Sequence, residues 1–172
     1  LAKHFANIGE LQGALEKLAL IYVNEKGKQR YSGQVTLAGL KGKAQLGDSS
    51  HSLQLEGTLR AHDNYVTVQG LEALLDGQQL QLEGEADLRD TEKPSAKGVL
   101  SAAKLNFADY TVQKLRLPFR ANKQEVIVEQ LAAAYGGGSI GANATYNLEE
   151  KVLTADMEVA GVTHATPNRP KD

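Results

Sequence analysis

A repeat at a fixed spacing constrains this chain more than any other feature. The stretch Val126–Leu148 has a counterpart sixty residues earlier, Val66–Leu88, and the two align without a gap. Each copy predicts a strand, a short bend, a glycine break and a second strand. A shorter echo, LQLEG, occurs at Leu53–Gly57 and again at Leu80–Gly84. Repetition of this kind is typical of stacked supersecondary units, so we expect similar elements that all carry the same apolar side.

Apolar and polar residues alternate with a period of two along most of the chain. In the first copy of the repeat, for example, Leu80 and Leu82 alternate with Gln81 and Glu83. Strict alternation predicts antiparallel strands with one dry face and one wet face, and almost no amphipathic helix is present to cover the dry face. Glycines inside the strand runs allow bends and close approach of neighbouring strands; they are Gly33, Gly57, Gly84 and Gly141. We therefore predict an all-β fold, an open and strongly curled antiparallel repeat sheet that forms an apolar groove.

The same patterns predict individual elements. Leu1–Asn7 has helical spacing, which predicts a short N-terminal helix. Gly9–Val23 fits a helical stripe as well as alternation, and its glycines favour the strand interpretation. Pro118 predicts that its strand lies at an edge or is bulged. The remaining predicted elements are the strands Leu11–Leu15, Leu18–Val23, Tyr65–Gln69, Leu80–Leu88, Ala96–Ala102, Asn106–Ala108, Thr111–Val112, Leu115–Ala121 and Lys151–Gly161, alternating runs over 31–46 and 53–61, and polar turns at 24–30, 47–50 and 62–64.

The organisation of the chain follows from length and polarity. Its 172 residues fit one segment of a longer β-groove repeat array, and because the chain begins at Leu1 rather than Met we expect any targeting segment or membrane anchor to lie outside it. We expect residues 1–88 to form a first part and residues 96–162 a second part. The polar stretch 89–95 is the expected boundary between them, and residues 163–172 are expected to form a frayed tail.

Composition excludes several classes of function. The chain is 41% apolar, which is enough to bury a core, but only 5% aromatic, and its formal net charge is −2. Binding of single-stranded nucleic acid relies on aromatic stacking and a basic surface, so no nucleic-acid partner is expected. Cysteine is absent, which excludes disulfides and thiolate metal sites.

Residues that could carry catalysis or bind metal are not grouped in the sequence. None of the histidines (His4, His51, His62 and His164) has a partner at a metal-ligand spacing, so we expect them to be solvated. The glycine-rich segment 136–141 lacks the Lys-Ser/Thr of a phosphate loop and leads into a strand rather than a helix. Glu149 and Glu150 are expected to be a solvated pair. We therefore expect neither an enzyme nor a cofactor or metal site.

Three interpretations of the apolar side remain open from the residues alone. The first is a lipid conduit, in which acyl chains of a phospholipid or another acyl-chain lipid lie in an open trough. Burial contributes about 0.8 kcal/mol per methylene, so a chain of about 16 carbons gains on the order of 10 kcal/mol before ordering costs. The second is a scaffold that adds a client strand at an exposed edge, and the third is a closed β-sandwich with an ordinary core. For the conduit, the predicted groove lining is Leu53, Leu55, Leu59, Val66, Val68, Leu80, Leu82, Leu105, Phe107, Leu117, Phe119, Val126, Val128, Ile140, Ala142, Tyr146 and Met157.

Two stretches carry a family resemblance. Tyr135–Leu148 (YGGGSIGANATYNL) with Leu153–Val162, and the short strands of Ala96–Val112, resemble the AsmA-like superfamily, most closely its TamB group. The resemblance implies a β-taco groove in the periplasm, anchored to the inner membrane through a segment outside this chain. It further implies phospholipid transport toward the outer membrane, a role in outer-membrane biogenesis and a TamA-like outer-membrane partner. A dimer formed through exposed groove ends is a further expectation.

Overall fold

The fold was analysed in a computed structural model that describes residues 7–8, 12–25, 28–46, 49–107 and 110–163. These residues form eleven β-strands and no helix. The strands are β1 (Asn7–Ile8), β2 (Gln12–Glu25), β3 (Lys28–Leu46), β4 (Ser49–His62), β5 (Tyr65–Leu75), β6 (Gln78–Asp87), β7 (Ser95–Phe107), β8 (Tyr110–Asn122), β9 (Glu125–Tyr135), β10 (Gly138–Asn147) and β11 (Val152–Ala160).

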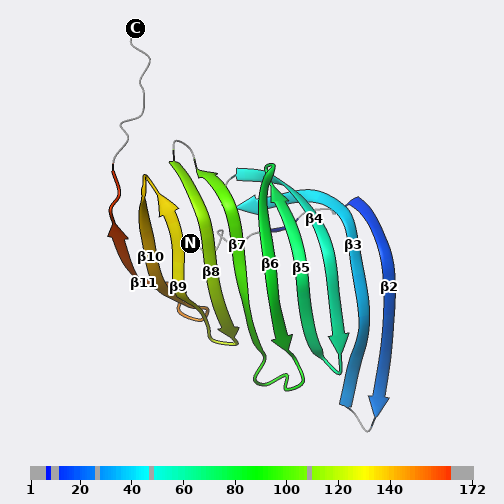
Figure 1. The fold of residues 1–172 in the computed structure, drawn as a ribbon. Helices are drawn as coiled ribbons and strands as arrows, with labels where there is room; N and C mark the ends of the chain where they lie inside the picture. Colours follow the sequence, from blue (N-terminus) through cyan, green and yellow to red (C-terminus); the bar gives the residue numbers. More distant parts are fainter. Residues whose placement is uncertain (1–6, 9–11, 26–27, 47–48, 108–109, 164–172) are drawn as a thin grey trace.

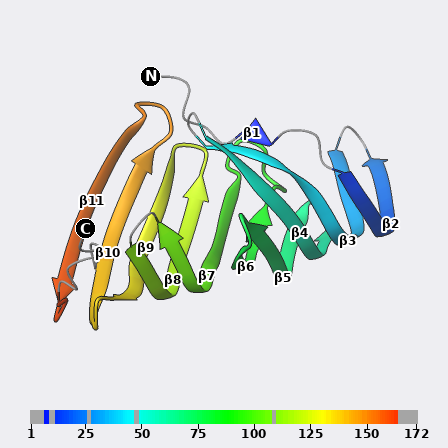
Figure 2. The same ribbon diagram turned by 90° about the horizontal axis from the view of Figure 1, so that it is seen from above.

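All eleven strands belong to one antiparallel sheet (Figures 1 and 2). From β3 to β11 each strand pairs with the next strand along the chain. β2 and β1 both pair with β3, β2 along residues 28–41 and β1 at Ala44 and Gln45, so they share one edge of the sheet. β11 forms the other edge and is not paired with β2, so the sheet is open. The predicted all-β antiparallel fold is confirmed.

The sixty-residue repeat of the sequence is also a repeat of structure. β9 begins and ends sixty residues after β5, and β10 begins and ends sixty residues after β6. The irregularity in pairing recurs as well. The pairing of β5 with β6 shifts between Val68 and Leu71, and the pairing of β9 with β10 shifts between Val128 and Leu131, which are the partners of Ala144 and Ala142. Even a hydrogen bond beyond the ladders recurs: Leu88 N–H donates to the carbonyl of Asn64 at 2.9 Å, and Leu148 N–H donates to that of Gln124 at 2.7 Å.

The repeating unit is four strands long. β8 and β4 also end sixty residues apart, so β3–β6 and β7–β10 correspond as units. The polar stretch 89–95 covers most of the connection between β6 and β7 and the first residue of β7. Pairing nevertheless runs across this connection without interruption from Gln81–Ser101 to Asp87–Ser95.

Several predicted strands are shorter than the strands in the structure. Leu11–Leu15 and Leu18–Val23 were expected as two strands, but one strand, β2, covers their described residues from Gln12 on and includes a register shift between Leu15 and Lys17. The described residues of the three short strands expected between Ala96 and Val112 are parts of the long β7 and β8. A bulge inserts one residue without ending the ladder, so it breaks the alternation but not the strand.

Pro118 lies in an interior strand, not at an edge. β8 pairs with β7 on one side and with β9 on the other, which corrects the expected edge position. The second expectation, an irregular strand, holds: the β8–β9 register shifts between Arg116 and Phe119, around the proline. Proline has no N–H to donate, so an interior strand tolerates it only where the ladder is locally open. Of the helix predicted at Leu1–Asn7 only Asn7 is described, and it lies in strand β1. Of the frayed tail predicted at 163–172 only Thr163 is described, and its N–H donates to the carbonyl of Gly136 at 2.9 Å.

All described strands lie in one sheet, and few of their side chains are buried. In the described part of the chain, close backbone approaches between different strands occur only between neighbours in the sheet. The chain exposes 12669 Å², whereas a compact globule of 18.5 kDa is expected to expose about 8,200 Å². Only Ala102, Leu105 and Ala133 are buried among the hydrophobic residues described. Most side chains of the sheet are therefore half-buried or exposed.

Candidate functional site

Strand register divides the side chains of the sheet into an apolar face and a polar face. Residues directly opposite each other on neighbouring strands project to the same side of a sheet. One row of such partners runs from β2 to β11 without a break: Leu18, Val35, Leu59, Val68, Gly84, Gly98, Phe119, Val128, Ala144 and Ala155. No position in this row is polar, and it crosses every strand of the sheet except β1.

A second unbroken row lies beside the first and is equally free of charge. It consists of Leu20, Gly33, Ala61, Val66, Ala86, Ala96, Ala121, Val126, Tyr146 and Leu153. Shorter rows fill the rest of the apolar face, and one of them joins Leu71, Leu82, Leu100 and Leu117. Along these rows the apolar face is continuous and uncharged, and neither the bulges nor the boundary between repeats interrupts it.

All seventeen residues predicted as groove lining have register positions on this apolar face. Leu80 and Leu82 lie on this face in β6, and Val126 and Val128 lie on it in β9. Met157 of β11 is opposite Ala142 of β10 and therefore lies on the same face. The backbone of Phe107 pairs with Tyr110, which gives Phe107 a register position on this face; its side chain is not among those the structure describes. Leu105 is buried, Met157 is exposed, and the fourteen others apart from Phe107 are half-buried.

The sequence prediction missed apolar-face residues that follow a bulge. Leu71 and Leu131 lie three positions after Val68 and Val128, so simple alternation assigns them to the wrong side. The extra residue is Gly70 in β5 and Gln130 in β9, both at positive φ (60° and 54°). In β9 the N–H of Gln130 donates to Oδ1 of Asn143 at 2.8 Å. In β5 the glycine directly before the leucine, Gly70, is the sequence signal that would have found Leu71.

Two glycines at the centre of the apolar face make room for an aromatic ring. Gly84 and Gly98 are register partners, and Phe119 is the next partner of Gly98. A Cβ at Gly98 would lie 3.0 Å from Cζ of Phe119 and 2.5 Å from the carbonyl oxygen of Glu83. The close approach predicted for Gly84 is confirmed, since a Cβ there would lie 2.7 Å from the carbonyl oxygen of Lys97, whereas at Gly141 the nearest atom is 3.8 Å away.

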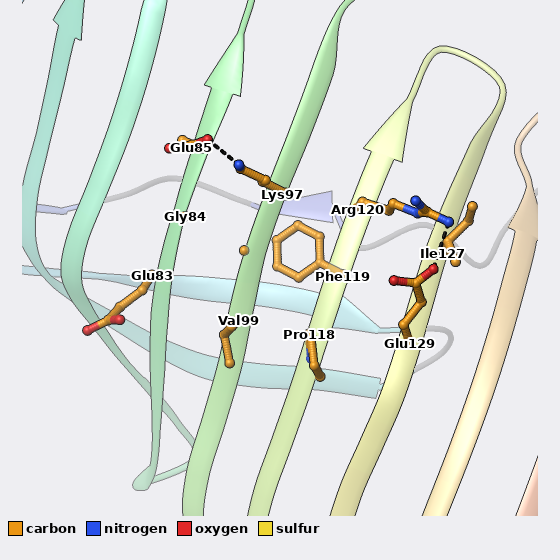
Figure 3. Close-up of a pocket in the computed structure, with 11 residues that line it drawn as sticks. Glu83, Gly84, Glu85, Lys97, Val99, Pro118, Phe119, Arg120, Ile127 and Glu129 are labelled. Atoms are coloured by element: carbon orange, nitrogen blue, oxygen red, sulfur yellow. Dashed lines mark ion pairs between the residues drawn. The ribbon is translucent and has the colours of Figure 1, made fainter.

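The opposite face carries ordered charges. Nζ of Lys97 lies 2.8 Å from Glu85, and the guanidinium of Arg120 lies 2.7 Å from Glu129, as Figure 3 shows. These side chains border a shallow hollow of about 500 Å³ whose remaining walls include Val99, Pro118 and Ile127. Each cation is neutralised by its own carboxylate, so the hollow presents no free cation to an anion.

Local charge pairs on this face shift several pKa values. The Arg89 side chain hydrogen-bonds to Asp87 and lowers the pKa of that carboxyl to about 2. The Lys97 ammonium lowers the pKa of Glu85 by a hydrogen bond, and Glu85 in turn raises the pKa of Lys97. All of these groups are solvent-accessible, so the pairs organise the polar face rather than a reactive centre.

The histidines form no metal centre in the part of the chain that the structure describes, where no group of three ligand side chains occurs. His51 is not simply solvated, as was expected, because its Nδ1 lies 2.6 Å from Asp76. Asp76 also accepts from Ser52 N–H at 2.7 Å, which ties the β5–β6 turn to β4. His62 is exposed; His4 and His164 lie outside the described residues. Among the described segments there is also no helix with the length and hydropathy needed to cross a membrane.

No protein-family model, curated protein or solved structure matches this chain.

Proposed function

We propose that this chain is a periplasmic segment of a TamB/AsmA-like protein and that its apolar face conducts phospholipid acyl chains between the inner and outer membranes. The observation that carries the proposal is the uncharged row of partners that crosses the sheet from Leu18 to Ala155. An acyl chain placed along such a row meets no polar side chain while the head group remains in water. Because neighbouring positions are alike, no single site holds the lipid much more strongly than the next.

The small number of buried side chains supports this use of the apolar face. Among the described hydrophobic residues only Ala102, Leu105 and Ala133 are buried, which is few for an ordinary core. The chain thus forms one sheet rather than the two packed sheets of a β-sandwich. Exposed aliphatic surface of this extent is typical of interaction sites, and its aliphatic composition matches hydrocarbon better than aromatic ligands.

The proposed groove needs the sheet to curl around the apolar face. In Figure 1 β3 and β4 bend along their length, and their register shifts at Leu37/Leu40 provide a cause. Figure 3 displays the polar-face side chains with two ribbons in the cyan of β3 and β4 crossing behind them. These bends support a concave apolar side, in which a lipid tail would be surrounded on more than one side.

Location, membrane anchoring and a TamA-like outer-membrane partner belong to the same proposal. Their support is the family resemblance of Tyr135–Leu148, Leu153–Val162 and Ala96–Val112. A role in outer-membrane biogenesis follows if the conduit delivers lipid there.

A photo-crosslinking pair on β6 tests the conduit directly. Leu82 lies on the apolar face and Gln81, the preceding residue, lies on the polar face. A photo-reactive side chain at position 82 should label phospholipid, and the same side chain at position 81 should not. Equal labelling at the two positions would overturn the proposal, and mass spectrometry of lipids that co-purify with the wild-type chain would identify the natural ligand.

The open edges favour a second candidate function, in which the sheet binds outer-membrane protein clients by strand addition. β11 has a neighbour on one side only in the described part of the chain. Its backbone groups on the other side are available to an extended peptide. A client peptide that binds without displacing lipid would support this scaffold function.

A further inference from the structure

The polar face carries three apolar side chains at positions that face water in an alternating strand. Val99 and Pro118 are register partners, and Ile127 is opposite Arg120, in the neighbouring row. All three are half-buried and line the hollow that the Lys97 and Arg120 ion pairs border (Figure 3). We call them the apolar cluster. An apolar centre inside a charged border is the arrangement found in protein–protein contacts.

The first repeat unit has threonine where the second has two members of this cluster. Ile127 corresponds to Thr67 and Pro118 to Thr58, each sixty residues earlier. Both threonines lie on the polar face, Thr67 directly opposite Glu85. A threonine hydroxyl can hydrogen-bond to water, whereas the side chains of isoleucine and proline cannot. A strand at this place in the unit therefore forms without apolar residues on its wet face, and the apolar cluster is a feature that the second unit adds.

The hollow continues along the strands as one elongated surface. A second hollow, of about 520 Å³, shares Glu85, Lys97, Arg120 and Ile127 with the first. The described lining of the two together has five carboxylates and two cations, and both cations are already paired. The carboxylates are Glu83, Glu85, Asp87, Glu125 and Glu129. The elongated hollow therefore has an excess of negative charge.

Two of these carboxylates have no cationic partner in the part of the chain that the structure describes. Glu83 and Glu125 take part in no ion pair there, whereas each of the other three does. Glu83 comes two residues before Glu85 on β6, and Glu125 comes two residues before Ile127 on β9, which runs in the opposite direction. The two therefore flank the row from Glu85 to Ile127 on opposite sides. Positive charges on a partner would meet a carboxylate at each end of the hollow.

We propose that the elongated hollow binds an extended basic segment of a partner protein, with an aliphatic or aromatic side chain on the apolar cluster and a lysine or arginine at each end. Opposite charge selects such a segment, and burial of its apolar side chain adds to the binding free energy. A protein segment fits this open, shallow surface better than a small molecule does, because small-molecule sites enclose most of their ligand. The site is on the face opposite the proposed conduit and does not rest on it.

A peptide that contains tryptophan tests this directly, because the chain itself has no tryptophan. Alternate side chains of an extended segment project to the same side. The end-blocked peptide Lys-Ser-Trp-Ser-Lys therefore presents its tryptophan and both lysines together. We expect titration with the wild-type chain to shift the tryptophan emission to shorter wavelength in a saturable manner. The peptide Glu-Ser-Trp-Ser-Glu, which has the same apolar anchor, should bind at least about tenfold more weakly.

Two variants assign the binding to the hollow. Ile127→Thr introduces the residue that the first unit has at this position and should weaken binding on the order of fivefold, because apolar surface under the anchor is lost. Glu83→Gln should weaken it about threefold, as expected for an exposed ion pair. Glu158→Gln is the matched control, since it removes the same charge from the polar face outside the hollow and should leave binding unchanged. Circular dichroism verifies the fold of each variant.

Three results of the peptide titrations would each overturn the proposal. They are equal binding of the two peptides, wild-type binding by a folded Ile127→Thr, and a loss in Glu158→Gln as large as that in Glu83→Gln. Displacement of the basic peptide by a phospholipid analogue would also overturn it, because the peptide would then lie on the apolar face. None of these results would alter lipid labelling at position 82, which tests the conduit separately.

Discussion

A carboxylate placed on the apolar face should abolish lipid binding while leaving the sheet folded. Leu82 is the position of choice, because it lies in the row that joins Leu71, Leu100 and Leu117. It is half-buried in the protein alone, so a bound acyl chain would cover the rest of its side chain. In Leu82→Glu, the chain would have to lie against a carboxylate.

The size of this effect follows from the cost of a charge in hydrocarbon. Placing a carboxylate at the centre of an apolar phase costs about 3 kcal/mol on insertion scales, which corresponds to about 100-fold weaker binding. The cost to folding is smaller, about 1 kcal/mol, because water still reaches this half-buried position. Gln81→Glu is the matched control: it adds the same charge one residue away, on the polar face.

Titration with a fluorescent phospholipid analogue measures the binding, and thermal unfolding followed by circular dichroism verifies the fold. We expect Leu82→Glu to lose about two orders of magnitude in affinity and Gln81→Glu to lose less than threefold. The reasoning is refuted if both variants bind lipid as the wild type does. It is also refuted if both lose affinity equally, since the face of the sheet would then be irrelevant.

Three further predictions concern the fold. Gly98→Ala should lower the stability by about 1–3 kcal/mol, because the new methyl group meets the ring beside it and a backbone carbonyl; Gly141→Ala, where the space is open, should change the melting temperature little. Leu105→Ala should cost about 2–3 kcal/mol in denaturant unfolding, since Leu105 is one of the few buried side chains. Asp87 has a pKa lowered to about 2, so its pair with Arg89 contributes stability above the unfolded pKa of about 3.9, and this contribution is lost as the pH falls toward 2; in Arg89→Gln, NMR titration should find the Asp87 pKa back near its ordinary value.

Alternation along the chain predicted an antiparallel sheet and the side of the sheet to which each lining residue belongs, but not where each strand begins and ends. Leu80 and Gln81 show why: with a period of two, neighbouring residues must project to opposite faces. Alternation failed at bulges, because the extra residue at Gly70 or Gln130 shifts the phase without ending the strand. The missed residues Leu71 and Leu131 therefore lie on the apolar face.

Pairing partners could not be predicted from pattern alone. The position of Pro118 in an interior strand depends on the local opening of the β8–β9 ladder, which is a property of two strands together. The His51–Asp76 contact likewise joins residues from β4 and the β5–β6 turn that only the register brings together. The small number of buried side chains was not predictable from composition, since a chain that is 41% apolar could equally have formed a larger core.

The number of four-strand units sets how far the sheet extends across its strands, independently of how long each strand is. Strands are about 4.8 Å apart, so each unit of sixty residues advances the sheet by about 19 Å, whereas strand length alone sets the dimension at right angles. Duplication of a unit would therefore extend the protein's reach in fixed steps and leave its cross-section unchanged. The distance spanned by such a chain would be encoded simply in how many units it contains.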